Sequence, residues 1–319
     1  MTLAVLALHV AAPPVCGAAQ TTDGPGPNYV LAPSALEARL SEQPFRITAF
    51  RDNRWQDDRT QRAQIRFPDG LRIEVKWAVA APGGFAINNQ PRYEVAAYEL
   101  QKLFLREPDW VVPPTTMREL PHPAYLQLDT TAVPTFEGTG SVLVAIQYWL
   151  RNVEPEPEPD SVRLAEDPAY ARRMAYLNLV THLMRHVDSN PGNVLVSTAG
   201  PPRLFAVDNG VAFRSPVSPR GTLWETLHVD RLPAEAVDRL RPLTRADLEE
   251  ALAVVAQFRV RDDGRLEAVR PTAKLDANRG VHRAGDVVQF GLTNLELDDL
   301  WDRIQQVLAR VASGELDTF

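Results

Sequence analysis

The sequence has one cysteine, no long apolar run after its N-terminus and no concentration of basic residues. Because Cys16 is the single cysteine among 319 residues, no disulfide can form within the chain. The 34 lysines and arginines are scattered and the formal net charge is −7, which argues against a nucleic-acid partner. Beyond the first residues, no stretch approaches the about 20 apolar residues of a membrane-spanning helix. We therefore predict neither a transmembrane segment nor nucleic-acid binding.

The chain does have enough apolar residues, 45%, for one large two-lobed domain or two ordinary domains. Residues 1–19 contain an apolar run followed by small residues, which predicts a signal peptide and export, to the periplasm or outside the cell. No lysine or arginine precedes that run, and Pro13 and Pro14 interrupt it. A misplaced start and a cytoplasmic protein are therefore the alternative. Residues 20–44 are predicted to be a linker and lead-in.

Residues 45–150 predict a β-rich lobe that carries one helix. Two alternating runs flank Asp69 and Gly70, a pair typical of a hairpin turn. Apolar residues at helical spacing then predict a helix over residues 92–107. The apolar run over residues 141–150 predicts a buried strand.

Residues 151–161 form an acidic, proline-rich stretch that predicts an extended connector between two lobes. Residues 162–319 predict a mainly helical second lobe. Helical spacing is found over residues 167–186, 245–258 and 293–313. The predicted fold class is therefore α+β, with a β-rich N-lobe that carries one helix and a mainly helical C-lobe.

Two polar breaks in the second lobe are spaced informatively. His186, Asp188 and Asn193 form the pattern H-x-D-x-x-x-x-N directly after the long helix. Asp208 and Gly210 form D-x-G after a short apolar strand, and Asp208 follows Asn193 by 15 residues. These spacings match a protein-kinase catalytic loop and its metal-binding aspartate. A hairpin between the two breaks would bring both metal ligands to one end.

A lysine with a nearby glutamate occurs upstream of these breaks. Lys76 lies on a predicted strand, and Glu94 or Glu99 on the next helix is its candidate partner. Kinases need this ion pair because it fixes the lysine against the α- and β-phosphates of ATP.

With these motifs, the sequence resembles the atypical, protein-kinase-like superfamily. The branch it resembles includes phosphatidylinositol 3- and 4-kinases, HipA-type bacterial kinases and the secreted Golgi casein kinases. The pattern D-N-G-x-A-F from Asp208 to Phe213 and the loop from Asp188 to Asn193 recur there. The string "YEVAAYELQKLF" followed by "VVPPT" is similar to the helix and next strand of the secreted kinases. The resemblance covers residues 45–230, and it selects Glu94 over Glu99 as the partner of Lys76.

The resemblance implies a bilobed protein-kinase-like fold and an ATP-dependent phosphotransferase. It would move the γ-phosphoryl group of ATP, with Mg²⁺ or Mn²⁺, to a hydroxyl acceptor on a protein, lipid or sugar. Adenine would lie near the backbone of residues 146–150. The implied roles are phosphate binding by Lys76 with Glu94, metal binding by Asn193 and Asp208, and proton acceptance by Asp188.

Two departures from the branch leave an alternative function open, although Lys76, Asp188, Asn193 and Asp208 are all present. Ser189 and Asn190 follow Asp188, where the branch usually has Arg-His. Residues 50–61, where a glycine-rich phosphate loop would fall, contain no glycine. The alternative is a pseudokinase that binds nucleotide as a regulator or scaffold.

A minor alternative is a zinc hydrolase. His182 and His186 are four residues apart on one helical face, with Asp188 nearby. Leu183 occupies the place of the general-base glutamate that such enzymes carry beside the first histidine. In the kinase interpretation, His186 is a structural support for the loop instead.

Overall fold

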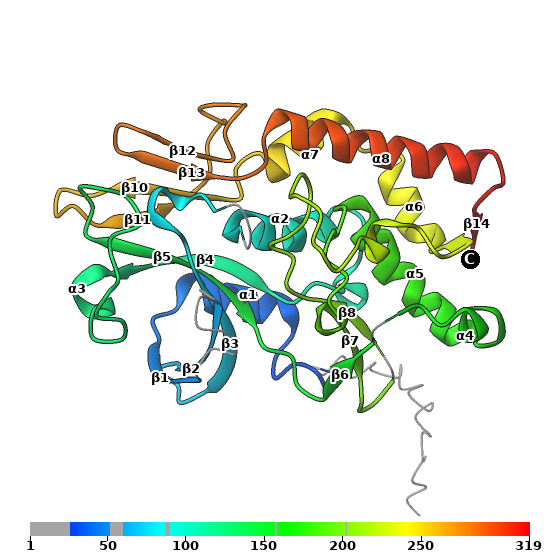
Figure 1. The fold of residues 1–319 in the computed structure, drawn as a ribbon, viewed down its shortest axis with the longest axis horizontal. Coiled ribbons are helices and arrows are strands. Elements are labelled where there is room, and N and C mark those ends of the chain that lie inside the picture. Colours follow the sequence, from blue (N-terminus) through cyan, green and yellow to red (C-terminus); the bar gives the residue numbers. More distant parts are fainter. Residues whose placement is uncertain (1–25, 52–59, 87–89, 157, 202) are drawn as a thin grey trace, which may run out of the picture.

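A five-stranded antiparallel sheet forms the first lobe (Figure 1). Its strands are β1 (Arg46–Arg51), β2 (Thr60–Arg66), β3 (Arg72–Val79), β4 (Thr115–Pro121) and β5 (Ser141–Tyr148), in the spatial order β1-β2-β3-β5-β4. Gly70 in the predicted hairpin turn has a φ of 91°, a conformation that favours glycine.

This computed structural model describes residues 26–51, 60–86, 90–156, 158–201 and 203–319. The predicted signal peptide, residues 1–19, lies outside the described residues.

The helix predicted after the hairpin is α2 (Pro91–Lys102), which covers one face of the sheet. Side chains alternate along β3, as a pleated strand requires. Val75 and Trp77 lie in an apolar cluster on one face, whereas Ala78 packs in a different cluster that includes a residue of α2. Lys76 shares the face of Ala78, so its side chain is directed toward α2.

Part of the range predicted to be linker, residues 20–44, is helical. Helix α1 (Pro33–Glu42) begins with proline at its first turn, a position that needs no backbone N–H. Leu36 and Leu40 are one turn apart and are fully buried against the first sheet. A short helix, α3 (His122–Tyr125), also belongs to this lobe.

The second lobe is built around the long helix α5 (Pro168–Leu183). The other helices there are α4 (Ser161–Glu166), α6 (Ala234–Leu240), α7 (Arg245–Leu252) and α8 (Asn294–Ala312). The short 3₁₀ helices in the described residues are η1 (Pro82–Gly84), η2 (Glu107–Asp109), η3 (Pro191–Asn193) and η4 (Leu223–Glu225). One large apolar cluster joins residues of α2, α5 and α8, so the core continues from one lobe into the other.

The acidic connector over residues 151–161 contains a short strand, β6 (Val153–Pro155). It pairs with β7 (Val194–Ser197), which pairs in turn with β8 (Leu204–Ala206). Strand pairing uses backbone groups, so a polar, proline-rich stretch can form it without apolar side chains. Another short pair joins β9 (Arg231–Leu232) to β14 (Asp317–Thr318).

A second antiparallel sheet, which the sequence patterns did not predict, follows α7. Its strands are β10 (Ala256–Val260), β11 (Leu266–Val269), β12 (Val281–Ala284) and β13 (Val287–Phe290), in the order β11-β10-β13-β12. Phe258, Val288 and Phe290 pack with Leu143 and Ala145 of the first sheet. The predicted helix over residues 245–258 therefore ends at Leu252, and its last residues form strand β10 instead. The chain changes to a strand because these side chains are buried against the first sheet.

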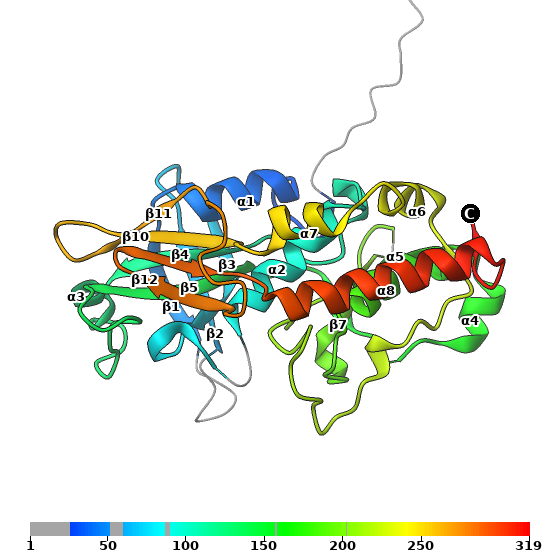
Figure 2. The same cartoon turned by 90° about the horizontal axis from the view of Figure 1, so that it is seen from above.

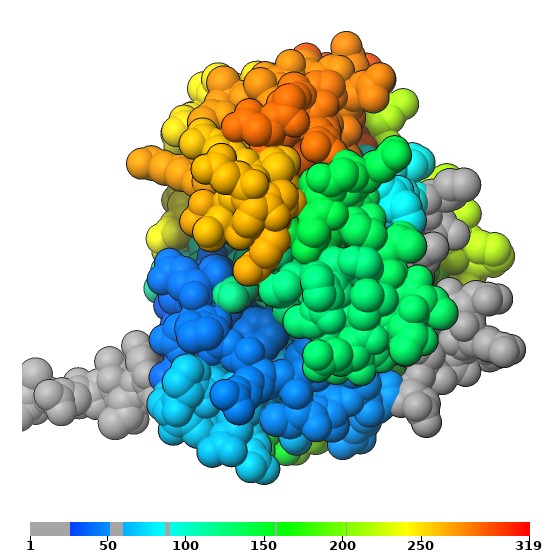
Figure 3. All heavy atoms as spheres, turned by 90° about the vertical axis from the view of Figure 1, so that its left-hand side faces the viewer, coloured from blue at the N-terminus to red at the C-terminus, as the bar shows by residue number. Residues whose placement is uncertain are grey.

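Figures 2 and 3 show how this second sheet sits in the molecule. β10 to β13 lie beside β4 and β5, and α8 runs from them across the second lobe. From the side, the orange and yellow surface of this segment covers one end of the first lobe. The chain is thus a two-lobed α+β protein whose C-terminal segment contacts both lobes. Within the described ranges, no helix combines the length and apolarity that crossing a bilayer requires.

Candidate active site

Lys76 on β3 connects three segments of the chain. Its Nζ atom forms an ion pair with Glu94 of α2 and another with Oδ1 of Asp208, at 2.5 Å, in the segment after β8. Lys76 and Glu94 are almost completely buried, whereas 43% of the Asp208 side chain is exposed. The lysine is therefore held between a buried carboxylate and one that faces solvent.

Backbone hydrogen bonds hold the start of α2 against the segment after β8. The backbone N–H of Asn209 donates to Oε2 of Glu94 at 3.1 Å, and the N–H of Gln90 donates to the carbonyl of Gly210 at 3.0 Å. Glu99, the other candidate partner of Lys76, instead forms an ion pair with Lys102 at 2.8 Å. Glu94 is thus positioned by its own helix and by the D-N-G segment.

The charges in this cluster are unbalanced. Burial favours the neutral form of Lys76, but the carboxylates of Asp208 and Glu94 outweigh it and raise the lysine pKa. Burial raises the pKa of Glu94, and Lys76 offsets that effect only in part. Lys76 holds the pKa of Asp208 below its ordinary value. One lysine serves two carboxylates, so the cluster has a surplus of negative charge that a cation would balance.

The H-x-D-x-x-x-x-N segment forms a closed loop after α5. Nδ2 of Asn193 donates to the backbone carbonyl and to Oδ2 of Asp188, both at 3.2 Å. The side chain of Asn190 accepts from the N–H of Gly192 at 3.2 Å and supports the turn into η3. Asp188 is 7% exposed and Asn193 is 1% exposed. The loop therefore fixes the position of the aspartate carboxylate.

The β7–β8 hairpin brings Asn193 and Asp208 to the same end. Val194 pairs with Ala206, and the N–H of Val207 donates to the carbonyl of Asn193 at 2.8 Å. Asp208 has a φ of 60°, a left-handed conformation that is uncommon for residues other than glycine. Such a conformation costs energy and persists only where the surrounding structure holds it. Residues of this kind are frequent at functional sites.

The residue types at this end suit a magnesium or manganese ion. Asp208 uses Oδ1 for Lys76, and its side chain is partly open to solvent. The amide nitrogen of Asn193 is used within the loop, so its oxygen is the atom available to a metal ion. Carboxylate and amide oxygens are the donors that these hard cations prefer. Asn193 and Asp208 therefore fit the metal that the kinase interpretation implies.

The segment after Asp208 adds two residues that the motif analysis missed. Oγ of Ser218 donates to Oδ1 of Asp188 at 2.8 Å, and Nη1 of Arg220 lies 3.6 Å from Oδ2 of the same carboxylate. The sequence did contain one signal for Arg220. Ser189 and Asn190 stand where a basic pair is usual, so another segment has to supply the missing positive charge.

The two histidines of the zinc-hydrolase alternative, His182 and His186, do not lie in a metal-binding group of described residues. His186 is 1% exposed, and its burial lowers its pKa. Nδ1 of His182 is hydrogen-bonded to the carbonyl of Glu225 at 2.7 Å. In the part of the chain that the structure describes, no three His, Cys, Asp or Glu side chains are grouped to hold a metal ion. The zinc-hydrolase hypothesis therefore has no ligand set in these residues.

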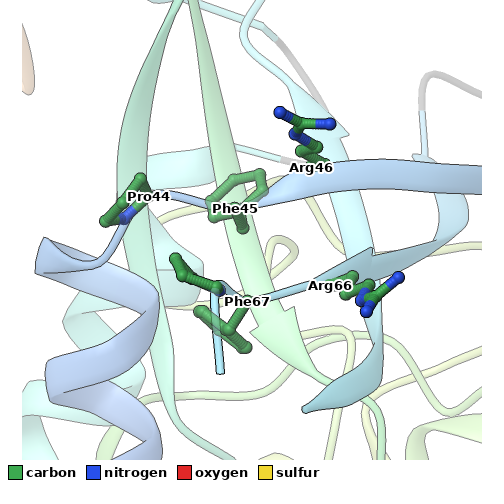
Figure 4. A pocket seen from close by; sticks show the side chains of 6 residues that line it. Pro44, Phe45, Arg46, Arg66 and Phe67 are labelled. Carbon is green, nitrogen blue, oxygen red and sulfur yellow. The ribbon is translucent and has the colours of Figure 1, made fainter. Parts of the chain in front are cut away.

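Among the described residues, hollows on the first lobe include two that lack Lys76, Glu94, Asp188, Asn193 and Asp208 from their linings. One of about 540 Å³ is found at the β1–β2 edge and contains none of the candidate site residues (Figure 4). Its lining residues are Pro44, Phe45, Arg46, Arg66, Phe67 and Pro68. The other, of about 300 Å³, is lined in part by Glu74, Tyr148 and Trp149. This second hollow adjoins residues 146–150, the predicted location of adenine.

The two lobes and the segments that meet at Lys76 make this a protein-kinase-like fold of the α+β class. Solved structures support that description. The chain is similar to two crystal structures of the Golgi casein kinase, over 88% of this chain and 75% of theirs. The structure with Mn and ADP bound has 12% identity and a TM-score of 0.53; the other has 11% and 0.52. At such low identity the likeness shows the fold alone. No protein-family model and no curated protein matches the sequence.

Proposed function

We propose that the protein is an ATP-dependent kinase that transfers the γ-phosphoryl group to a hydroxyl acceptor. The observation that carries this proposal is the double pairing of Lys76 with Glu94 and Asp208. That pairing connects a lysine, which can bind the phosphates of ATP, to an aspartate, which can bind the metal ion. The Golgi casein kinase structure of similar fold has Mn and ADP bound, the kinds of ligand that this proposal assigns to the present site.

In this proposal, different residues bind the phosphates of ATP and the metal ion. Lys76, fixed by Glu94, contacts the α- and β-phosphates, and Asn193 and Asp208 hold Mg²⁺ or Mn²⁺. A cation held by these two residues would supply positive charge that offsets the negative charge of the phosphates during transfer. Adenine lies near residues 146–150, two of which, Tyr148 and Trp149, line the smaller hollow.

Asp188 orients the acceptor hydroxyl and takes its proton. Its carboxylate is already fixed by Asn193, so little reorganisation is needed when the acceptor arrives. Arg220 adds a positive charge beside this carboxylate. We propose that it substitutes for the basic residue that is missing after Asp188.

A pseudokinase is the second candidate, because Ser189 and Asn190 replace the usual Arg-His. Such a protein would bind ATP at the same residues without consuming it. The acceptor of an active kinase would be a hydroxyl group on a protein, a lipid or a sugar.

We also propose the predicted chain organisation, with lobes over residues 45–150 and 162–319 joined by the connector over 151–161, and with helix α1 added to the first lobe because it packs on its sheet. Export through residues 1–19 is part of this proposal, and N-terminal sequencing of the protein made from its own gene start tests it. A mature N-terminus near residue 19 is expected, and an N-terminus that retains residues 1–19 would contradict export.

The decisive experiment measures ADP formed from ATP with Mg²⁺ or Mn²⁺. Lys76→Met is expected to abolish turnover, because methionine keeps the length of the side chain but not its charge. Lys102→Met is the matched control, since Lys102 also pairs with a glutamate of α2 but lies away from Asp208. ATP binding without ADP formation in the wild type would favour the pseudokinase. If the wild type neither binds ATP nor forms ADP, both candidates are contradicted.

A further inference from the structure

The hydroxyl of Ser218 occupies the position that the acceptor of the proposed kinase would take. Its Oγ atom donates to Oδ1 of Asp188 at 2.8 Å. A general base must lie within hydrogen-bond reach of the proton that it abstracts, about 2.6–3.2 Å between heavy atoms. Ser218 already meets that requirement, although it lies 30 residues from Asp188 in the sequence.

Ser218 opens a tight turn whose residues suit it. The N–H of Gly221 donates to the carbonyl of Ser218 at 3.0 Å, which closes a four-residue turn. Serine at the first position, Pro219 at the second and glycine at the fourth are favoured in such turns. Gly221 also has a φ of 97°, so a side chain there would be strained. The turn therefore presents the serine with a defined geometry.

Backbone hydrogen bonds attach this turn to both neighbours of Asp188. The N–H of Ser218 donates to the carbonyl of Val187 at 2.9 Å, and the N–H of Ser189 donates to the carbonyl of Gly221 at 3.2 Å. Oγ of Ser189 also accepts from the N–H of Leu223 at 2.6 Å. The serine is thus held opposite the aspartate by the main chain on both sides.

The hydroxyl of Ser218 is oriented as a nucleophile. Its oxygen accepts from the N–H of Arg220 at 3.2 Å while its own hydrogen is directed at Asp188. The Arg220 guanidinium lies beside the same carboxylate and is 57% exposed, so it is accessible to a phosphate group. Ser215, in the same segment, has no hydrogen-bond partner for its hydroxyl among the described residues and does not contact Asp188.

We propose that Ser218 is a self-phosphorylation site of this protein, an inference that rests on the proposed kinase function. A bond forms between Oγ of Ser218 and the γ-phosphorus of ATP, and the bond from that phosphorus to the β–γ bridging oxygen breaks. ADP leaves with the electron pair, and the hydroxyl proton passes to Asp188. The acceptor class that this geometry favours is therefore a serine in a polypeptide.

Phosphorylation would also change the position of the turn. A phosphoserine carries between about −1.5 and −2 charges at neutral pH and would be repelled by the Asp188 carboxylate. Arg220 lies two residues further on and can pair with the phosphate outside the site. Departure of Ser218 frees the position beside Asp188 for an external acceptor.

The test incubates the purified full chain with ATP and Mn²⁺ and follows intact mass, phosphorylation sites and ADP. The wild type and the control Ser215→Ala are expected to gain one phosphate, mapped to Ser218. Ser218→Ala is expected to lose that phosphate while its thermal unfolding stays close to that of the wild type. Because the serine comes from the same molecule, the rate per molecule should not change on dilution.

Each other outcome has a defined meaning. ADP formation with an unmodified Ser218 would overturn this inference and leave the proposed kinase standing. A rate per molecule that falls on dilution would show that a neighbouring molecule supplies the serine, and would overturn the intramolecular geometry. No ADP at all would contradict the kinase proposal and this inference together.

Discussion

Arg92 on α2 forms a two-pronged ion pair with Glu296 at the start of α8. Nη1 of Arg92 lies 2.7 Å from Oε2 of Glu296, Nη2 lies 2.8 Å from Oε1, and both side chains are more than 90% buried. The hydroxyl of Tyr93 also donates to this glutamate. Arg92 precedes Glu94 by two residues, so the C-terminal segment holds the same turn of α2 that pairs with Lys76.

Glu296→Gln is expected to destabilise the protein by about 3–5 kcal/mol, because it leaves the buried charge of Arg92 uncompensated. Glutamine still supports the capping contact with Thr293, so the loss reports the charge rather than the helix cap. Denaturant unfolding measures the change in the free energy of unfolding.

Asp298→Asn is the matched control for Glu296→Gln. Asp298 lies on the same helix and pairs with Arg245, but 57% of its side chain is exposed. Exposed pairs contribute between 0 and about 1 kcal/mol, so this variant should unfold nearly as the wild type does. Equal effects of the two substitutions would show that the Arg92 pair does not hold α2.

ATP with Mg²⁺ or Mn²⁺ is expected to raise the melting temperature of the wild type. A ligand that binds only the folded state adds about 2.7 kcal/mol of stability at 100 times its dissociation constant. Asp208→Ala should remove the part of the shift that depends on the metal, because it removes the carboxylate that faces solvent beside Lys76. Thermal-shift titrations with and without metal measure both quantities.

Asp238→Ala provides the control for that titration. Asp238 lies on α6, and 73% of its side chain is exposed, so its loss should leave the nucleotide shift unchanged. The absence of any shift at saturating nucleotide with either metal would remove the kinase and the pseudokinase together.

Local sequence patterns predicted the elements whose pattern is short-range. The hairpin at Gly70, helix α2 and the buried strand β5 each follow from periodicity or turn chemistry within a few residues. The 15-residue spacing from Asn193 to Asp208 matches a hairpin, whose register is also local. These features were accessible to sequence analysis because neighbouring residues determine them.

Features that depend on contacts between distant residues were not predictable in this way. Residues 245–258 have helical spacing throughout, and only packing of Phe258 against the first sheet makes the end of that stretch a strand. The contact between Ser218 and Asp188 joins positions that no spacing rule relates. Helix α1 had one local signal, which was Pro33 followed by Leu36 and Leu40. The whole range 20–44 was nevertheless predicted to be a linker, on the composition of its first residues.

Lys274 is expected to make the free energy of unfolding rise with pH just above pH 8. Burial beside Arg92 lowers the pKa of Lys274 from 10.5 to about 8, although Glu296 and Asp276 oppose this. Between these two pH values Lys274 binds its proton more in the unfolded chain than in the folded chain, so this group favours folding as the pH rises, by at most about 1.4 kcal/mol per pH unit. Near pH 10 the buried tyrosines oppose this effect, because burial raises their pKa values from 10.0 in the folded chain. The rise is therefore expected between pH 8 and about 9. Urea unfolding across this pH range measures the slope.

Lys274→Met tests the origin of that slope. Methionine has a similar length but does not titrate, so the contribution of this site to the slope should disappear. Lys102→Met, which alters a lysine on the outer part of α2, should retain the slope of the wild type. A slope that is the same in wild type and Lys274→Met would assign the pH dependence to other groups.

Asp188→Asn separates transfer from nucleotide binding. Asparagine keeps the size of the side chain but is not a proton acceptor, so phosphoryl transfer should slow by about 100-fold or more. Asp188 contacts Asn193, Ser218 and Arg220 rather than Lys76, so the thermal shift with ATP and metal should barely change. Turnover and thermal shift are measured on the same preparation.

The position of Asp188 makes the result of that substitution informative. Lys76→Met should abolish transfer and lower ATP binding, because Lys76 contacts the phosphates in the proposed function, whereas Asp188→Asn should lower transfer alone. Asp238→Asn makes the same chemical change at an exposed site and should leave both unchanged. If Asp188→Asn keeps wild-type turnover and normal ATP binding, Asp188 is not the base. The hydrogen bonds from Asn193 and Ser218 would then only stabilise a turn that shares the spacing of a catalytic loop.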